Sequence, residues 1–171
     1  MSVARPSIQS LLIQMCFNGQ LLATGTGFIV ESRLGPVLVT NRHNVTGRNQ
    51  ETGEPLSDKG GIPNEIQIIH NCKNMLGTWI EKIEPLYFSN QLPRWYEHPL
   101  LGSQADFVAL PLSNTDGIDV YPYDLNNPGP DIAIGPSEIC SVVGFPFGLQ
   151  AGVLISDLCG LQFPDYFDQS V

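Results

Sequence analysis

The stretch VLVTNRHNVTG, residues 37–47, decides how this chain is interpreted. Residues 37–40 form an apolar, β-branched run, which is typical of a short strand, and this run leads the chain to His43. A histidine that follows a strand is either a chemical group held at the end of that strand or a loop residue whose stem packs on it. Partners elsewhere in the sequence must decide between these two interpretations.

The segments around this stretch predict more strands and no sustained helix. The pair Asn18-Gly19 is a two-residue hairpin signal. Gly25 and Gly27 lie within a strand pattern, where glycine indicates a bulge or a close backbone approach. About six strands are expected before residue 113, at 8–17, 21–32, 37–40, 65–70, 77–88 and 105–112. In the fifth of these, we expect Trp79, Ile83 and Leu86 to point inward.

Six antiparallel strands can close into a small barrel, so the fold class predicted is all-β. The domain organisation predicted is a complete β unit over 1–112, a linker over 113–136 rich in Asp, Asn, Pro and Gly, and the start of a second β unit over 137–171. Two further strands cannot form a domain alone. We therefore expect this second unit to be incomplete.

The composition is that of a folded domain, with 42% hydrophobic and 15% charged residues among 171. The net charge of −9, with every Lys and Arg at or before Arg94, argues against nucleic acid as a partner, because phosphate contacts need basic side chains. No apolar run approaches the roughly 18 residues of a membrane span, and no targeting segment is recognisable. A cytoplasmic protein without membrane attachment is the expectation.

The four cysteines have no CxxC spacing and are expected to be small buried hydrophobes in a reducing compartment. Scattered histidines and cysteines offer no ligand pair at useful spacing, so we expect no metal and no other cofactor.

Asp106 is the candidate partner of His43. It stands directly before the apolar run FVAL at 107–110, and a carboxylate placed there needs a hydrogen-bonding partner. An imidazole held by a carboxylate is a proton acceptor for a neighbouring hydroxyl, since the unperturbed pKa of histidine is about 6.5. Asp116 and Asp119 could compete for this role, but they lie in a turn-rich segment where we expect no strand to hold them.

Four motifs in order resemble the trypsin-like serine proteases, and most closely the bacterial branch that includes the high-temperature-requirement proteases. TGTGFIVES at 24–32 resembles the family strand G-[ST]-G-F, and GPVLVTNRHNV at 35–45 resembles the strand that ends T-x-x-H. ADFVALPL at 105–112 resembles D-x-[AV]-x-L, and VVGFPFGL at 142–149 resembles G-x-P-x-G. The resemblance covers roughly residues 20–150.

The resemblance implies a chymotrypsin-like fold of two antiparallel β-barrels, the first complete and the second only partly present. It also implies peptide-bond hydrolysis by a Ser-His-Asp triad, with His43 as general base, Asp106 as its carboxylate and a polypeptide as substrate. Secreted members often have a cysteine directly after the histidine; Asn44 at that position indicates an intracellular relative.

The nucleophile that the resemblance requires is missing from the sequence. The family places its serine in G-x-S-G, and no such segment occurs. The late serines lack the glycines of a tight turn that would point two amides at an oxyanion; they are Ser137, Ser141, Ser156 and Ser170. We therefore expect the chain as given to be inactive, as a fragment, a truncated product or a pseudoenzyme.

Two other hypotheses remain open. The first is a non-catalytic module that binds a peptide or partner protein, for example by adding a strand to a sheet edge. The second, which we consider weaker, is a hydrolase that uses Cys72 or Cys140 with His43, although neither cysteine lies in a small-residue turn.

Overall fold

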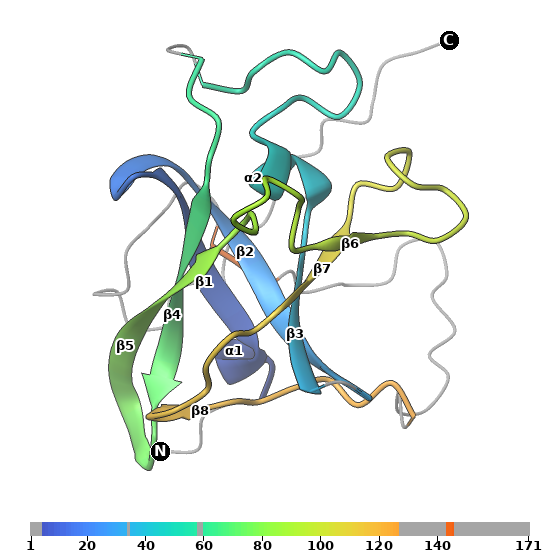
Figure 1. Cartoon of the computed structure of the whole chain (residues 1–171). Coiled ribbons are helices and arrows are strands. Elements are labelled where there is room, and N and C mark those ends of the chain that lie inside the picture. The colour runs from blue at the N-terminus through green and yellow to red at the C-terminus, as the bar shows by residue number, and fades with distance from the viewer. Residues whose placement is uncertain (1–4, 34, 58–59, 127–142, 146–171) are drawn as a thin grey trace, which may run out of the picture.

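The computed structural model describes residues 5–33, 35–57, 60–126 and 143–145, and these form a mainly antiparallel β structure with two short helices (Figure 1). The helices are α1 (Arg5–Gln9) and α2 (Arg42–Thr46). The strands are β1 (Ser10–Phe17), β2 (Gln20–Ser32), β3 (Gly35–Thr40), β4 (Glu65–Cys72), β5 (Met75–Pro85), β6 (Tyr96–Glu97), β7 (Val108–Pro111) and β8 (Ile118–Asp119). The all-β prediction is confirmed, and each of the six expected strands is present.

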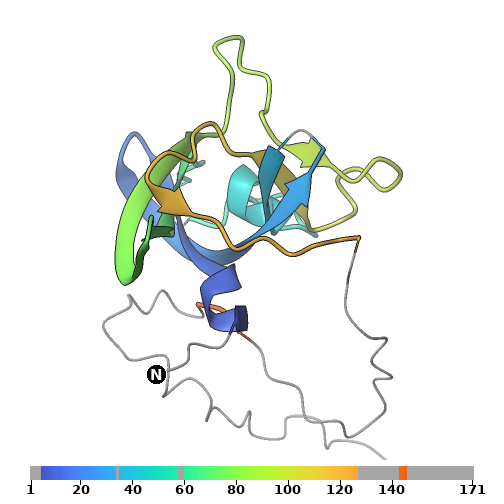
Figure 2. The same cartoon turned by 90° about the horizontal axis from the view of Figure 1, so that it is seen from below.

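One sheet contains all eight strands, in the order β5-β4-β1-β2-β3-β7-β6, with β8 paired to β4. Every pairing between these strands is antiparallel. Seen from below, the sheet curves around its interior and α1 lies beneath it (Figure 2). The strands β6 and β8, two residues each, were not predicted.

The β1–β2 hairpin turns at Asn18 and Gly19, as predicted. Both residues have positive φ, 50° and 78°, which is the geometry that this dipeptide favours in a two-residue hairpin loop. The register shift in the hairpin lies between Met15 and Cys16 rather than at Gly25 or Gly27. The glycines of β2 are therefore explained by close approach, which is described with the site below.

The core lies on the inner face of the curved sheet. Alternating residues of β4 and β7 point into it, since side chains along a strand alternate between its two faces. Its fully buried members include Ile13, Ile29, Leu38, Ile66, Ile68, Val45, Leu86 and Leu110. Burial of each such side chain stabilises the fold by about 1.5–3 kcal/mol. Val45 belongs to α2, so this core also anchors the short helix that carries His43.

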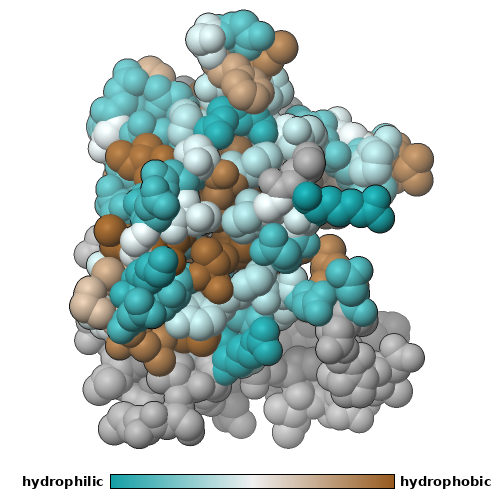
Figure 3. Space-filling view, turned by 60° about the horizontal axis from the view of Figure 1, so that its bottom comes forward, coloured by the Kyte–Doolittle hydropathy of each residue, from teal (hydrophilic) through white to brown (hydrophobic). Residues whose placement is uncertain are grey.

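The inner face of β5 differs from the prediction. Trp79 and Ile83 are about half exposed, at 49% and 52%, so their predicted inward orientation is wrong, whereas Leu86 is fully buried as expected. The pairing of β5 with β4 instead places Glu84 inward, opposite the buried Ile66. Exposed apolar residues are not confined to this strand: on the face of the molecule shown in Figure 3, apolar residues lie among polar ones.

Glu84 is only 2% exposed and is compensated by two groups from other segments. The backbone N–H of Ser113 donates to its Oε1 at 2.8 Å, and the Arg94 guanidinium lies 3.5 Å from its Oε2. A carboxylate at this depth requires such partners, because an unpaired buried charge is strongly destabilising. Glu84 therefore joins β5 to the segments on either side of β7.

Within the range predicted as a linker, residues 113–126 lie along the sheet. They include β8, and the Tyr123 N–H donates to the Ile29 carbonyl at 2.8 Å. Residues 127–136, and the predicted second unit except 143–145, lie outside the described residues. None of the helices that the structure describes has the length and apolar character needed to cross a membrane.

Candidate functional site

His43 is positioned by the end of β3 and by a short, well-anchored helix. Strand β3 ends at Thr40, Asn41 is the N-cap of α2, and His43 is the second residue of that helix. The helix stops at Gly47, whose φ of 62° lies in the left-handed region and whose N–H donates to the His43 carbonyl at 2.9 Å. A Cβ at Gly47 would lie 2.5 Å from Cδ of Pro63, so a larger residue there would clash with the loop that follows.

Asp106 meets His43 because β3 and β7 are neighbours. In this antiparallel pair, Thr40 is opposite Val108, so the end of β3 lies beside the beginning of β7. His43 follows Thr40 by three residues, and Asp106 precedes Val108 by two. Two residues 63 positions apart are thereby brought to the same edge of the sheet.

Both oxygens of the Asp106 carboxylate contact His43. Nδ1 of the imidazole lies 2.7 Å from Oδ2, and the backbone N–H of His43 donates to Oδ1 at 3.1 Å. An ionised carboxylate only accepts hydrogen bonds, so this contact favours the tautomer with the proton on Nδ1 and a free acceptor at Nε2. About a third of each side chain is exposed, 35% for His43 and 31% for Asp106. This geometry leaves one imidazole nitrogen available to accept a proton.

Asn41 is a third member of the cluster, and sequence reasoning missed it. Its Nδ2 donates to Oδ2 of Asp106 at 3.1 Å and to the Asp106 carbonyl at 3.2 Å. An asparagine directly before a helix is most simply interpreted as a capping residue. For this reason the sequence pattern does not indicate a contact with Asp106.

Arg42, the first residue of α2, ties this helix to β6. Its Nε donates to Oε1 of Glu97 at 2.9 Å, and β6 in turn pairs with β7. The pair is partly exposed, so its contribution to stability is within about 1 kcal/mol. Its effect is to hold α2 alongside the strand that follows Asp106.

The glycines of β2 make room for a polar network beneath α2. Asn44 donates to Oγ1 of Thr40 at 2.9 Å, and Thr40 donates to the Thr26 carbonyl at 2.8 Å. A Cβ at Gly25 would lie 2.9 Å from Nδ2 of Asn44, and one at Gly27 would lie 2.7 Å from Cδ1 of Leu38. Glycine at both positions therefore allows β2, β3 and α2 to approach closely.

Residues 143–145, which precede Pro146 in the predicted G-x-P-x-G motif, contact β1 and β2. The Phe145 N–H donates to Oγ1 of Thr26 at 2.8 Å, and Oγ of Ser10 donates to the Val143 carbonyl at 3.3 Å. Thr26 thus connects the network beneath the helix of His43 with Phe145, which follows Thr26 by 119 positions.

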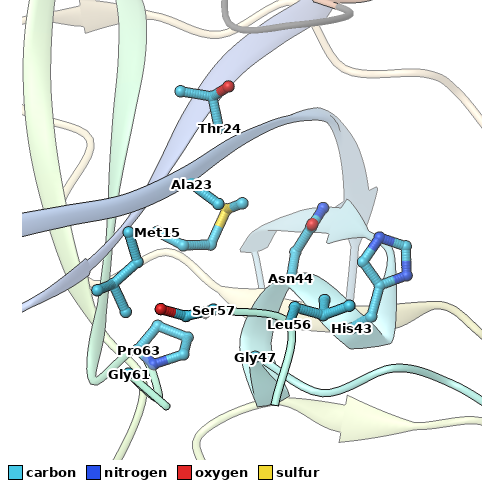
Figure 4. A pocket seen from close by; sticks show the side chains of 11 residues that line it. Met15, Ala23, Thr24, His43, Asn44, Gly47, Leu56, Ser57, Gly61 and Pro63 are labelled. Atoms are coloured by element: carbon cyan, nitrogen blue, oxygen red, sulfur yellow. The ribbon is translucent and has the colours of Figure 1, made fainter. Parts of the chain in front are cut away.

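A pocket of about 230 Å³ opens beside the imidazole (Figure 4). His43 and Asn44 form one side, and the remaining wall comes from β1, β2 and the loop after α2. Most of these other residues are apolar or small: Met15, Leu22, Ala23, Thr24, Gly47, Leu56, Ser57, Gly61 and Pro63. A pocket of this character suits an uncharged side chain better than a charged one.

The other two histidines are not part of this cluster. His70 is buried on the inner face of β4, where burial and then the charge of Lys82 lower its pKa to about 4. Nδ1 of His98 accepts the N–H groups of Leu100 and Leu101, at 3.2 and 3.1 Å. His98 therefore stabilises its own loop.

The alternative candidates for the carboxylate and for the nucleophile either lie away from His43 or lie outside the described residues. Asp119 lies in β8, contrary to the expectation that no strand holds it, and its Oδ2 accepts the Asn74 N–H at 2.8 Å. Cys72 ends β4 as a free thiol. Cys140 and the four late serines (Ser137, Ser141, Ser156 and Ser170) lie outside the described residues. Among the residues that the structure describes, no three His, Cys, Asp or Glu side chains are grouped as a metal ion would require.

Comparison with protein-family models, with curated proteins and with solved structures gives no match for this chain. What the site can do must therefore be inferred from its residues and their geometry.

Proposed function

We propose that this chain carries the general base and the supporting carboxylate of a trypsin-like serine endopeptidase. The observation that carries the proposal is the contact of His43 with Asp106, made through both the imidazole and the backbone N–H at 2.7 and 3.1 Å. A carboxylate held in this way orients the ring and stabilises the imidazolium that forms during catalysis.

In the proposed reaction, Nε2 of His43 accepts the proton of a serine hydroxyl as its oxygen attacks the peptide carbonyl carbon. The same proton then passes to the leaving amine nitrogen as the peptide bond breaks, and water repeats the sequence on the acyl-enzyme. Since the sequence contains no G-x-S-G, the nucleophile is not assigned to any residue, and residues 1–171 are proposed to be inactive alone.

The arrangement of the strands supports a chymotrypsin-like barrel as the finer description of the fold. The two outer strands of the sheet are β5 and β6. The segment that joins them, residues 86–95, folds back so that its last residues lie beside the end of β5. There the Arg94 N–H donates to the Leu86 carbonyl, and the Phe88 N–H donates to the Leu92 carbonyl, both at 2.9 Å. These bonds bring the two edges of the curved sheet toward each other, as closure requires.

The pocket beside His43 supports a polypeptide as the substrate. It is continuous with the imidazole and is lined mostly by apolar side chains from Met15, Leu22, Leu56 and Pro63. A substrate side chain placed there would lie next to the group that transfers the proton. We propose a peptide with an uncharged side chain near the scissile bond.

The test is proteolysis by a native gene product that contains residues 1–171 together with a G-x-S-G serine. Cleavage of a fluorescent casein is expected, with the reaction abolished by His43→Ala and reduced about 10⁴-fold by Asp106→Asn. Ser137→Ala is the control, because the proposal gives that serine no role. A purified, folded product without any cleavage or labelling by a fluorophosphonate serine probe would overturn the proposal.

The second candidate function is peptide binding by strand addition, and the edge strand β5 favours it. This strand has 11 residues, pairs only with β4 within the described structure, and exposes Trp79 and Ile83. Unpaired backbone groups along such an edge can accept an extended peptide. A stable, non-hydrolytic protein that captures extended peptides, and loses them when Trp79 is changed to Ser, would favour this alternative.

A further inference from the structure

We propose that Asn41 is a positioning residue that locks the Asp106 carboxylate against His43. The inference deepens the proposed function, on which its catalytic meaning rests, by assigning a residue to the support of the base. It starts from the two hydrogen bonds of the Asn41 carboxamide, to Oδ2 of Asp106 at 3.1 Å and to the Asp106 carbonyl at 3.2 Å.

The first part of the argument is that Asn41 is not used as a helix cap. Its backbone is extended, with φ −64° and ψ 143°, as an N-cap residue should be, yet its side chain makes no capping bond to α2. Asparagine is among the preferred N-cap residues because its side-chain oxygen normally accepts an N–H of the first turn. Here that preferred interaction is given up.

The second part is that Asp106 takes over the vacant capping position. The His43 N–H, which belongs to the first turn of α2, donates to Oδ1 of Asp106 at 3.1 Å. With this N–H satisfied from another segment, the Asn41 side chain is free to turn its amide toward the same carboxylate. Helix capping by Asp106 and donation by Asn41 are therefore parts of one arrangement.

The third part concerns what the amide does to the carboxylate. Oδ1 of Asp106 accepts a hydrogen bond from the backbone N–H of His43. Oδ2 is hydrogen-bonded to Nδ1 of the His43 imidazole and to Nδ2 of Asn41. The second bond of Asn41, to the Asp106 carbonyl, holds the carboxamide itself. With both oxygens engaged, rotation of the carboxyl group would break at least one bond. Asn41 thereby maintains the acceptor that keeps the His43 proton on Nδ1.

The test measures the tautomer of His43 by ¹⁵N NMR of the histidine rings, recorded at a pH where the rings are neutral. In the unmodified chain, Nδ1 of His43 should resonate as a protonated nitrogen. His98 provides an internal reference of the opposite kind, because its Nδ1 accepts two backbone N–H groups and must be unprotonated. Asp106→Asn is the variant in which the carboxylate is absent.

Asn41→Ala and Asn41→Ser separate positioning from capping. Serine is as good an N-cap as asparagine, so a purely structural role would be preserved in the serine variant and lost in the alanine variant. A positioning role predicts that both variants shift Nδ1 of His43 toward the unprotonated range while His98 is unchanged. Asn49→Ala, in a loop where the side chain only accepts from Glu51 and Thr52, should leave His43 unaffected.

The two possible failures can be told apart. An unchanged His43 tautomer in folded Asn41→Ala and Asn41→Ser would overturn the role of Asn41 and leave the pairing of His43 with Asp106 intact. If instead the unmodified chain already carries its proton on Nε2 of His43, and Asp106→Asn changes nothing, the pairing is absent in solution. That result would overturn the proposed function together with this inference.

Discussion

Acidification should destabilise this protein through the buried His70. His70 is 1% exposed, and burial, followed by the nearby charge of Lys82, lowers its pKa from 6.5 to about 4. In the unfolded chain the ring takes up a proton near pH 6.5, whereas in the folded chain it resists protonation until about pH 4. The unfolded state therefore binds more protons in this window, and folding stability falls as the pH falls through it.

The expected loss follows from the size of the shift. A change of one pKa unit corresponds to 1.36 kcal/mol, so the shift from 6.5 to about 4 amounts to about 3 kcal/mol. The contribution of His70 is complete above pH 6.5, declines between pH 6.5 and 4, and is fully lost below pH 4. Urea unfolding at pH 7, 6, 5 and 4.5 measures it, with His70→Gln as the variant and Leu100→Ala, at an 88% exposed position without a titratable group, as the control.

The difference in unfolding free energy between the unmodified chain and His70→Gln should shrink steadily as the pH falls, while Leu100→Ala follows the unmodified chain. Direct ¹⁵N NMR titration of the His70 ring gives the same answer without any substitution. Protonation of that ring near pH 6 in the folded protein, or pH profiles of the unmodified chain and His70→Gln that run parallel, would refute the reasoning.

Five substitutions test the stability of the site and its packing, two of them as controls. Asp106→Asn removes charge-assisted hydrogen bonds at a position about one-third exposed, so a loss of about 1 kcal/mol is expected, or about 2–4 °C in Tm by calorimetry; an unchanged Tm would contradict the hydrogen bonding described. Leu38→Ala, at a fully buried position, should cost about 2–5 kcal/mol in urea unfolding. Leu100→Ala, at 88% exposure, should change stability by less than about 0.5 kcal/mol, and equal effects at the two positions would be inconsistent with the core. Gly47→Ala must adopt a positive φ and also approach Pro63 to 2.5 Å, whereas Gly19→Ala has only the positive φ and open space; thermal unfolding should therefore show the larger loss for Gly47→Ala, and the reverse order would argue against this packing.

Local patterns were sufficient to predict most strands of the sheet. Asn18-Gly19 favours a two-residue turn in any context, and the β-branched run before His43 favours extended backbone. Both features depend on residues adjacent in the sequence, so the chain needs no distant partner to show them. The approximate positions of six strands followed from such signals and agree with the structure.

The inner face of β5 could not be predicted from its own residues. Trp79 and Ile83 are more apolar than Glu84, so hydropathy alone predicts that they are buried, yet the pairing of β5 with β4 places Glu84 inside. What makes this face possible is the Arg94 guanidinium and the Ser113 N–H, which come from two other segments. Side-chain hydropathy within one strand carries no information about partners of that kind.

The sequence by itself determined the candidate pair, because His43 and Asp106 each stand beside a strand in a recognisable local pattern. Only the tertiary structure decided that they meet, through the register of β3 with β7, and that Asn41 turns away from its helix toward the carboxylate. The physical reason is that strand propensity and turn chemistry act over a few residues, whereas hydrogen bonds between side chains depend on distances that the folded sheet alone sets.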